Sequence, residues 1–525
     1  MKKTCGILII SALIIAIVFA IFYRGSSMSS KGVFVNGIQI SDEAGYRYID
    51  DQHYVSFDLL VGNDLLDAYY DQQDKTIYIY KSYNRLTLDL PLESDRFMVE
   101  DQKVFISTVF VGESMEAGYT IEVDKESVYI DNNYYHVVAN RSFWVYESPS
   151  QSIRNRFGKI SSGTTLRGYS YDNEWVVLKY NDGIGYAKKQ NVSINKVVTP
   201  PVELLNQESK KIVMAWDFFT RKPNAFVTPT LVGGLNAISP TWHDLEEDFG
   251  YTDWSLAEYV EYYQRQNIEV WPAFTNSFDP SLTSKMLNDP TYRSNTIKQI
   301  INIAIQNQYD GINLDYENIY LEDKEVFAVF VRDLYIASRN ANLSMSVDIT
   351  ILSQSPTWSL FYDRKTIGKY SDYVMLMAYD ERTRPEHGIG PIASIPWVEN
   401  GLKGLVELVP ANKIVLGIPF YTRLWETIYE NGSVRYDVTA LRLQTAINFV
   451  NNHDFTFEFD AQAGQNYGEA TDGNILYQIW MEDTVSLENR LDLVYDFDLA
   501  GVAVWALDYG TPEMWEVIEK RFWGQ

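Results

Sequence analysis

The last part of the chain, from about residue 211 to residue 525, alternates short apolar runs with stretches in which apolar residues recur every three to four positions. Short apolar runs are typical of strands buried on both faces, and the longer stretches are typical of amphipathic helices. The number of short runs is eight, which a closed (β/α)8 barrel requires. We expect these strands at 212–216, 235–238, 269–274, 311–314, 344–349, 373–377, 414–418 and 501–505.

A strand-rich stretch at about 422–500 separates the last two of these runs. A single helix usually joins neighbouring barrel strands, so this length predicts an insertion. The fold class we expect is therefore α/β, with a C-terminal TIM barrel at 211–525 that carries its insertion between the seventh and eighth strands.

Residues 33–132 have a different pattern, in which apolar and polar residues alternate as in half-buried strands. The segment 54–79 is repeated 50 to 51 residues later, at 104–130, which predicts a small duplicated α+β domain. This pattern resembles the copper amine oxidase N-terminal-like domain of exported bacterial proteins. His53 alone cannot form a copper site, so we expect a spacer or stalk.

Short β-type runs separated by Gly and Asn-Asp turns follow at 136–195 and predict a small all-β domain. The segments 148–150, 163–164, 175–178 and 183–186 resemble those of bacterial SH3-like barrels. Two interpretations are open, a module that binds wall peptides or a spacer packed on its neighbour, because Trp175 suits a pocket and a core equally. The polar, proline-containing stretch 196–210 is expected to be a linker.

The chain begins with a segment that resembles a membrane address. Lys2 and Lys3 precede an apolar run at 6–22, and its length lies between those of a secretory signal and a membrane-spanning helix. We expect an uncleaved signal anchor at 1–24 followed by a tether at 25–32, and a cleaved signal is the alternative. Either way the bulk is exported, because the lysines stay on the cytoplasmic side. We therefore expect a single-pass protein of the bacterial cell membrane, or a secreted one.

Charge and composition limit the partners. The 44 Lys and Arg residues against 70 Asp and Glu residues give a net charge of −26, which argues against nucleic-acid binding because that requires clustered positive charge. The single cysteine and five scattered histidines argue against a disulfide, redox or zinc site, although carboxylates are able to hold calcium. We expect no cofactor.

Residues 310–317 read Asp-Gly-Ile-Asn-Leu-Asp-Tyr-Glu and cover the fourth expected strand and the residues just after it. Side chains alternate along a strand, so Asn313, Asp315 and Glu317 should face the barrel axis together with Gly311. Inward polar side chains are costly unless they bind each other or a ligand. They also fall at the carboxyl end of the strand, where barrel active sites form. The octapeptide therefore predicts a catalytic site.

The same octapeptide resembles the DxxDxDxE signature of glycoside hydrolase family 18, the chitinase-like family. Three later segments, 377–380, 416–421 and 501–505, are similar to that family's pattern at the matching strand ends. The segment 477–483 resembles its cell-wall and spore-germination branch. The resemblance covers the whole expected barrel.

The resemblance implies roles for individual residues. Glu317 would be the general acid, Asp315 would orient the 2-acetamido group that attacks the anomeric carbon, and Tyr379 would donate to its oxygen. Such substrate-assisted hydrolysis retains the anomeric configuration and needs an N-acetyl group. The resemblance also places Asn313, Met377, Asp380, Tyr421, Trp480 and Trp505 around the sugar, with Asp310 and Gly311 as structural support.

Asn313 departs from the family pattern, because most chitinases carry aspartate there. An amide can hydrogen-bond to Asp315 but cannot take up charge, so the family's carboxylate relay and pH profile should differ here. Four tryptophans suit stacking against a sugar as well as core packing: Trp216, Trp271, Trp425 and Trp480.

These observations favour an exported glycosidase that cleaves β-1,4 bonds next to N-acetylglucosamine in peptidoglycan. The alternatives are a chitinase or chitooligosaccharide hydrolase, and a catalytically silent chitinase-like protein that only binds sugar. The expected partners are an N-acetylglucosamine-containing polysaccharide and, through the N-terminal helix, a membrane.

Overall fold

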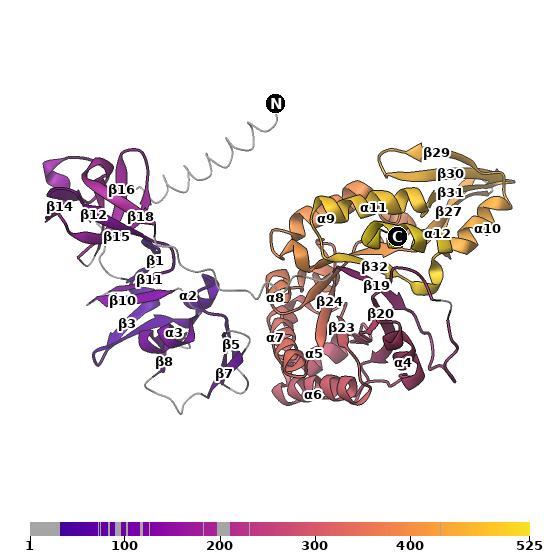
Figure 1. Ribbon diagram of the computed structural model, residues 1–525, viewed down its shortest axis with the longest axis horizontal. Helices are drawn as coiled ribbons and strands as arrows, with labels where there is room; N and C mark the ends of the chain where they lie inside the picture. Colours follow the sequence, from indigo (N-terminus) through magenta and orange to yellow (C-terminus); the bar gives the residue numbers. More distant parts are fainter. Residues whose placement is uncertain are drawn as a thin grey trace. The chain divides into compact units, whose positions relative to one another are not determined.

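The computed structural model describes residues 32–524 except 72, 74, 82–83, 90–95, 101–102, 116–118, 125–126, 182, 197–210, 230 and 431. The chain forms two compact units, Met1–Leu205 and Asn206–Gln525 (Figure 1). The expected signal anchor and most of the expected linker lie outside the described residues. No helix among the residues that are described is long and apolar enough to cross a bilayer.

The first part of unit 1 contains the predicted repeat. Helix α2 (Phe57–Gly62) follows β4 (Gln52–Ser56), and α3 (Thr108–Ser114) follows β9 (Lys103–Ser107). Strands β4 and β9 pair antiparallel, with Val55 opposite Ile106, so the two copies share one buried core. The other strands are β1 (Gly32–Val35), β2 (Ile38–Ser41), β3 (Tyr46–Ile49), β5 (Ala68–Asp71), β6 (Thr76–Lys81), β7 (Asn84–Asp89), β8 (Phe97–Glu100), β10 (Thr120–Asp124) and β11 (Ser127–Asp131).

The second part of unit 1 is a seven-stranded antiparallel sheet with the order β14-β13-β17-β16-β15-β12-β18. Trp175 is buried edge-on against Tyr146, with ring centroids 5.8 Å apart, so its indole belongs to the core. Arg167 pairs at 2.6 Å with the buried Asp131 of the first part, which joins the two parts. The strands are β12 (Tyr135–Ala139), β13 (Phe143–Tyr146), β14 (Arg156–Ile160), β15 (Thr165–Tyr171), β16 (Trp175–Tyr180), β17 (Gly183–Lys188) and β18 (Val192–Lys196).

Unit 2 is a closed barrel of parallel strands, as the eight apolar runs predicted. The barrel closes where β19 (Ile212–Asp217) pairs with both β20 (Ala237–Asp244) and β32 (Gly501–Trp505). Between them lie β22 (Ala273–Thr275), β23 (Gly311–Asp315), β24 (Ser344–Thr350), β25 (Tyr373–Met377) and β26 (Ile414–Pro419).

The third run differs in one respect from the prediction. It forms two short strands, β21 (Glu269–Val270) and β22, instead of one. Pro272 lies between them and has no N–H to donate to a ladder, so the strand is interrupted there.

Helices surround the barrel. Asp279 and Asp289 cap α5 (Pro280–Asn288) and α6 (Pro290–Gln306), and each accepts two backbone N–H groups next to a proline at the first helical position. The other helices of the barrel layer are α4 (Ala257–Arg265), α7 (Lys324–Asn340), α8 (Arg364–Lys369), α9 (Ile395–Leu405), α11 (Thr484–Asp496) and α12 (Pro512–Trp523).

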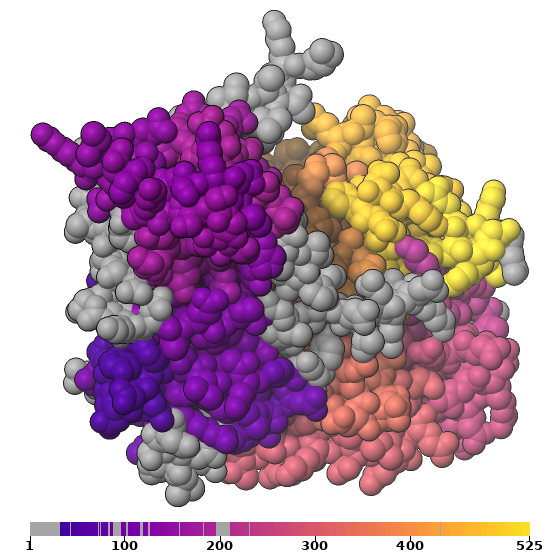
Figure 2. Space-filling model, turned by 60° about the vertical axis from the view of Figure 1, so that its left-hand side comes forward, coloured from indigo at the N-terminus to yellow at the C-terminus, as the bar shows by residue number. Residues whose placement is uncertain are grey.

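A five-stranded antiparallel sheet with the order β28-β27-β31-β30-β29 occurs in the chain between β26 and β32, where the insertion was expected. Figure 2 shows the late, orange and yellow part of unit 2 above its pink first half. Helix α10 (Leu443–Asn451) covers one face of this sheet. The strands are β27 (Tyr421–Glu430), β28 (Ser433–Arg442), β29 (Thr456–Asp460), β30 (Gln465–Asp472) and β31 (Ile475–Met481).

Candidate active site

The fourth barrel strand, β23, directs its side chains as the alternating pattern predicted. Tyr316 points outward and stacks on Phe330 of α7, with ring centroids 5.5 Å apart. Asn313 points inward, since it bonds to residues of β19, β20 and β24. Asp315 is therefore on the inward face, and Glu317 follows two residues later at the carboxyl end of the barrel.

The backbone of Glu317 is held by a residue that the sequence reasoning missed. Asn276, just after β22, accepts a hydrogen bond from Glu317 N at 3.0 Å and donates to Glu317 O at 2.7 Å. Asn276 is fully buried and also donates to Thr283 Oγ1. Its position directly after a barrel strand was the only signal in the sequence. These two bonds fix the backbone from which the Glu317 side chain projects.

Burial and nearby negative charge keep Glu317 protonated. Desolvation raises the pKa of Glu317 well above its usual range, and the charges of Asp315 and Asp380 raise it further. Burial, with a smaller contribution from the charge of Asp244, raises the pKa of Asp315 to about 7. Near neutral pH the site can therefore contain a protonated Glu317 next to an ionised Asp315, which is the pairing that general acid catalysis requires.

Tyr379 lies just beyond β25 and faces the same carboxylates. Burial raises the pKa of its phenol well above the usual range, with contributions from Tyr421, Asp348, Asp315 and Glu317. The phenol therefore keeps its proton and is able to donate it in a hydrogen bond. Glu317, Asp315 and Tyr379, the three predicted catalytic residues, are thus brought together.

Asp380 is held by two groups from β27. Its Oδ1 accepts from the Tyr421 hydroxyl at 2.9 Å and from the Arg423 guanidinium at 2.7 Å. The sequence reasoning included Tyr421 but missed Arg423, which lies on the same face of β27 two residues later. Asp380 itself has a positive φ of 67°, a conformation that aspartate tolerates better than most residues.

Met377 is the last residue of β25 and Trp505 is the last residue of β32, so both lie at the barrel mouth. Trp505 is half-buried and packs on Trp216 and Phe218, with ring centroids 6.0 and 5.4 Å away. Met377 is also half-buried, at the end of β25. Both positions are compatible with the expected contacts to a sugar.

Three of the four candidate sugar platforms are wrong. Trp216, Trp271 and Trp425 are buried inside unit 2, and the indole N–H groups of Trp216 and Trp425 donate to Asn313 and to Gly390 O. Their rings are therefore parts of the core. Trp480 is half-buried next to Tyr467, and its indole N–H donates to Asp460 at 2.9 Å, so it keeps an accessible edge.

Asn313 bonds to other partners than Asp315, contrary to the expectation. Its Oδ1 accepts from Trp216 Nε1 at 2.9 Å and Ser239 Oγ at 3.0 Å. Its Nδ2 donates to Ser346 Oγ at 3.0 Å and to Asp348 Oδ1 at 2.6 Å. An amide has two donors and two acceptor lone pairs, so none is left for a substrate. Asn313 is therefore a buried support beneath the site, and Asp348 is a further carboxylate that the sequence reasoning missed.

The two expected support residues are both structural. Gly311 lies where an added Cβ would be 2.7 Å from Ser344 O and from Trp271, so a larger residue would push the neighbouring strand away. Asp310 points away from the mouth and accepts from Val270 N and Gln264 Nε2 at 2.9 and 3.0 Å.

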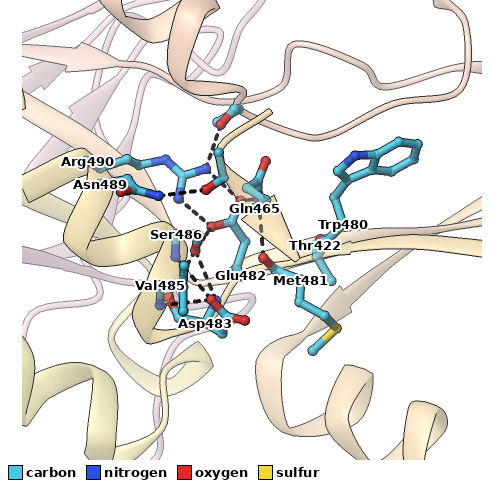
Figure 3. Close-up of polar contacts among 12 residues, drawn as sticks. Thr422, Gln465, Trp480, Met481, Glu482, Asp483, Val485, Ser486, Asn489 and Arg490 are labelled. Carbon is cyan, nitrogen blue, oxygen red and sulfur yellow. Dashed lines mark hydrogen bonds and ion pairs between the residues drawn. The ribbon is translucent and has the colours of Figure 1, made fainter. Parts of the chain in front are cut away.

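A buried ion pair joins Glu482, just after the last strand of the insertion, to Arg490 of α11 (Figure 3). Both Glu482 oxygens accept from Arg490 of α11, at 2.5 and 2.8 Å, and they also accept from Ser486 and Gln465. Arg490 donates in addition to Ala393 O at 2.6 Å. Ala393 ends the segment 381–393 that follows Tyr379 and Asp380, so this pair anchors that segment to α11.

Comparisons with known proteins agree with this geometry. The family model described as glycosyl hydrolases family 18 matches residues 234–510. The chain is 26% identical over 306 residues to the uncharacterized glycosylase YvbX of Bacillus subtilis (strain 168), over 54% of this chain and 84% of that protein. It is 25% identical over 269 residues to the cortical fragment-lytic enzyme of the same strain, over 49% of this chain and 61% of that enzyme. The chain thus spans less than two thirds of the length of the latter.

Solved structures show the same fold. The spore cortex-lytic enzyme SleL of Bacillus megaterium QM B1551 matches with a TM-score of 0.52 and 20% identity, over 63% of this chain and 77% of that one. A chitinase of Chromobacterium violaceum ATCC 12472 matches with a TM-score of 0.51 and 20% identity, over 60% of this chain and 99% of that one. At such low identity the likeness concerns the barrel fold alone.

Proposed function

The chain belongs to glycosyl hydrolases family 18 and is a glycoside hydrolase, and on that premise we propose that it hydrolyses β-1,4 bonds next to N-acetylglucosamine in peptidoglycan. The observation that carries the proposal is the convergence of Glu317, Asp315 and Tyr379 at one barrel mouth, with a protonated acid beside an ionisable carboxylate.

The proposed reaction has two steps. Glu317 gives its proton to the glycosidic oxygen while the 2-acetamido oxygen of the sugar attacks the anomeric carbon. Asp315 stabilises the positive charge that develops on the acetamido nitrogen, and Tyr379 donates a hydrogen bond to the acetamido oxygen. Water then opens the cyclic intermediate, and Glu317 takes back a proton. Two inversions at the anomeric carbon give net retention of configuration.

Two observations favour peptidoglycan over chitin as the substrate. One similar protein is named for the lysis of cortical fragments, and the sequence predicts a membrane anchor that would keep the enzyme near the cell wall. Chitin hydrolysis is the second candidate, supported by the likeness to chitinases among proteins of the same family. A silent sugar-binding protein would have no need for the raised pKa of Glu317.

The remaining parts fit a membrane-tethered hydrolase. In this proposal residues 1–24 anchor the protein with the bulk outside the cell, and 33–132 form a copper amine oxidase N-terminal-like stalk without copper. Residues 136–195 form an SH3-like spacer, since Trp175 is a core residue and Arg167 joins this part to Asp131 of the preceding one.

Digestion of purified sacculi and of chitin oligomers by the full chain, with mass analysis of the products, tests the proposal. We expect new reducing-end N-acetylglucosamine from sacculi, and loss of about 10²-fold or more in rate for Glu317→Gln. The matched control is Glu322→Gln, an exposed glutamate five residues away, which should cleave as wild type does. Undiminished turnover by Glu317→Gln would overturn the assigned acid. Turnover of chitin oligomers alone would favour the chitinase, and binding without turnover would favour the sugar-binding protein.

A further inference from the structure

We propose that Asp348 is a positioning residue that carries a proton and donates it in a hydrogen bond to Asp315, which keeps Asp315 ionised during catalysis. The inference rests on the proposed function. Asp348 lies on β24, a strand that contributes nothing to the DxxDxDxE signature at 310–317.

The strand register brings the two carboxylates together. Leu314 of β23 pairs with Val347 of β24, so the next residues along, Asp315 and Asp348, are neighbours on adjacent strands. Both point inward, because Asn313 and Ser346, two residues earlier on the same strands, bond to each other inside the barrel. Asp315 and Asp348 are 7% and 1% exposed.

Each of the two carboxylates has one buried oxygen that no donor among the described residues reaches. Asn313 Nδ2 donates to Asp348 Oδ1 at 2.6 Å, while Asp348 Oδ2 and Asp315 Oδ1 have no hydrogen-bond partner among the described residues. Two buried acceptors without donors are costly, and a single proton placed between them satisfies both. Asn313 cannot supply that proton, because its amide is fully used.

The groups around Asp348 and Asp315 decide which of the two carboxyls holds the proton. Asp348 faces Asp315 and Glu317 from β23 and its end, Tyr379 from β25, Tyr362 from the segment before α8, and the Trp216 indole. Arg364 lies near Tyr362, but its guanidinium donates to Ser359 and Thr350.

Asp348 is the better proton holder of the pair. Burial and the charge of Asp315 raise the pKa of Asp348 well above its usual range, whereas the pKa of Asp315 is about 7. Near neutral pH, Asp315 therefore ionises first while Asp348 and Glu317 keep their protons. Of the carboxyls of Asp315, Asp348 and Glu317, only that of Asp315 is then charged, which limits the cost of desolvation.

The proton of Asp348 does not leave during the reaction. When Glu317 protonates the leaving oxygen and positive charge forms on the acetamido nitrogen, Asp315 is already an anion that this charge can pair with. The Asp348 O–H bond stays intact and orients the Asp315 carboxylate. Position 313, where the family usually has a second aspartate, is then free to hold an amide that orients Asp348.

The pH dependence of kcat/KM tests the proposal, because its acid limb reports the ionisation of Asp315 in the free enzyme. Asp348→Asn keeps both an acceptor for Asn313 and a donor for Asp315, so its acid limb should stay within about half a pH unit of wild type. Asp348→Ala removes the donor, and its acid limb should move up by about one pH unit. If Asp348 is ionised instead, Asp348→Asn removes a negative charge and its acid limb moves down by about one unit, which overturns the proposal. Acid limbs at the same pH for Asp348→Asn and Asp348→Ala also overturn it.

A measurement without turnover keeps the test independent of the proposed function and of the stability of Asp348→Ala. Infrared spectra of the full chain at about pH 8, where ordinary carboxyls are ionised, resolve protonated carboxyl groups. Glu317→Gln should retain a protonated carboxyl band that Glu317→Gln/Asp348→Asn lacks. Identical spectra for these two variants would overturn the proposal, whether or not any polysaccharide is cleaved.

Discussion

Asn276 binds the backbone of Glu317 on both sides, accepting from its N–H at 3.0 Å and donating to its C=O at 2.7 Å. The carboxyl of the proposed acid is thereby positioned by an uncharged residue that follows the preceding barrel strand. Glu317 lies beyond the last ladder pair of β23, so strand pairing alone does not fix its direction.

Replacing Asn276 by alanine should therefore change the position of the Glu317 carboxyl without removing the carboxyl itself. The change leaves the Glu317 backbone groups unpaired in a partly buried place, which should cost about 1–3 kcal/mol of unfolding free energy. A shift of the carboxyl by about 1 Å should lower kcat by about 10²-fold. Urea unfolding and steady-state kinetics measure both effects, with the exposed Asn451→Ala as a control. An unchanged kcat in a folded Asn276→Ala protein would contradict this role.

The pH–rate profile should change when Asn313 becomes aspartate. A further carboxylate next to Asp348 adds negative charge to the cluster and raises the pKa values of its members. We expect the optimum of Asn313→Asp to move to higher pH, because Glu317 then keeps its proton longer and Asp315 ionises later. Superimposable profiles for Asn313→Asp and wild type would remove this idea.

The contribution of Glu317 and Asp315 to protein stability should fall as the pH rises above about 4, where free carboxyls ionise. Glu317 and Asp315 have folded pKa values above their unfolded values, so the folded state binds more protons there than the unfolded state. By linkage the free energy of unfolding then decreases with rising pH until the folded pKa is passed. Glu317→Gln removes one such group and should flatten the decline, seen as a smaller loss of Tm between pH 5 and pH 8 (roughly the window set by these pKa values). An unchanged slope would show that Glu317 titrates normally.

The Glu482–Arg490 pair should stabilise the fold. It should affect the site only through the segment 381–393, because Arg490 bonds to Ala393 O. Arg490→Ala leaves a buried carboxylate without its partner and should cost about 3–5 kcal/mol of unfolding free energy. Arg490→Ala/Glu482→Leu should recover a large part of that loss, because no unpaired charge remains. Denaturant unfolding of the three proteins gives the comparison. A double variant that is less stable than Arg490→Ala would contradict the argument.

The sequence was sufficient for the barrel and for the inward placement of Asn313 and Asp315 on β23. Alternation along 310–317, together with the position of barrel active sites, places Asp315 and Glu317 correctly without coordinates. Asp348 was missed although Ser344, Ser346 and Asp348 alternate in the same way, because nothing in the chain says that this polar face meets Asp315. That contact depends on the register between β23 and β24, which a sequence does not display.

The tryptophans show what could not be predicted from the sequence. Trp216, Trp271 and Trp425 have the chemistry of a sugar platform, but all three are buried. The indole N–H groups of Trp216 and Trp425 also find partners far away in the chain. Asn313 was expected to bond to Asp315, yet its partners come from three other strands. Pairwise contacts over such distances cannot be read from local patterns.

The anomeric configuration of the first product distinguishes attack by the 2-acetamido group from direct attack by water. Proton NMR during the first minutes of hydrolysis of a β-1,4-linked N-acetylglucosamine substrate distinguishes the two anomers before mutarotation mixes them. The 2-acetamido group acting as nucleophile above Asp315 predicts that the β-anomer appears first. Initial release of the α-anomer would mean direct attack by water, and it would rule out the proposed substrate-assisted mechanism.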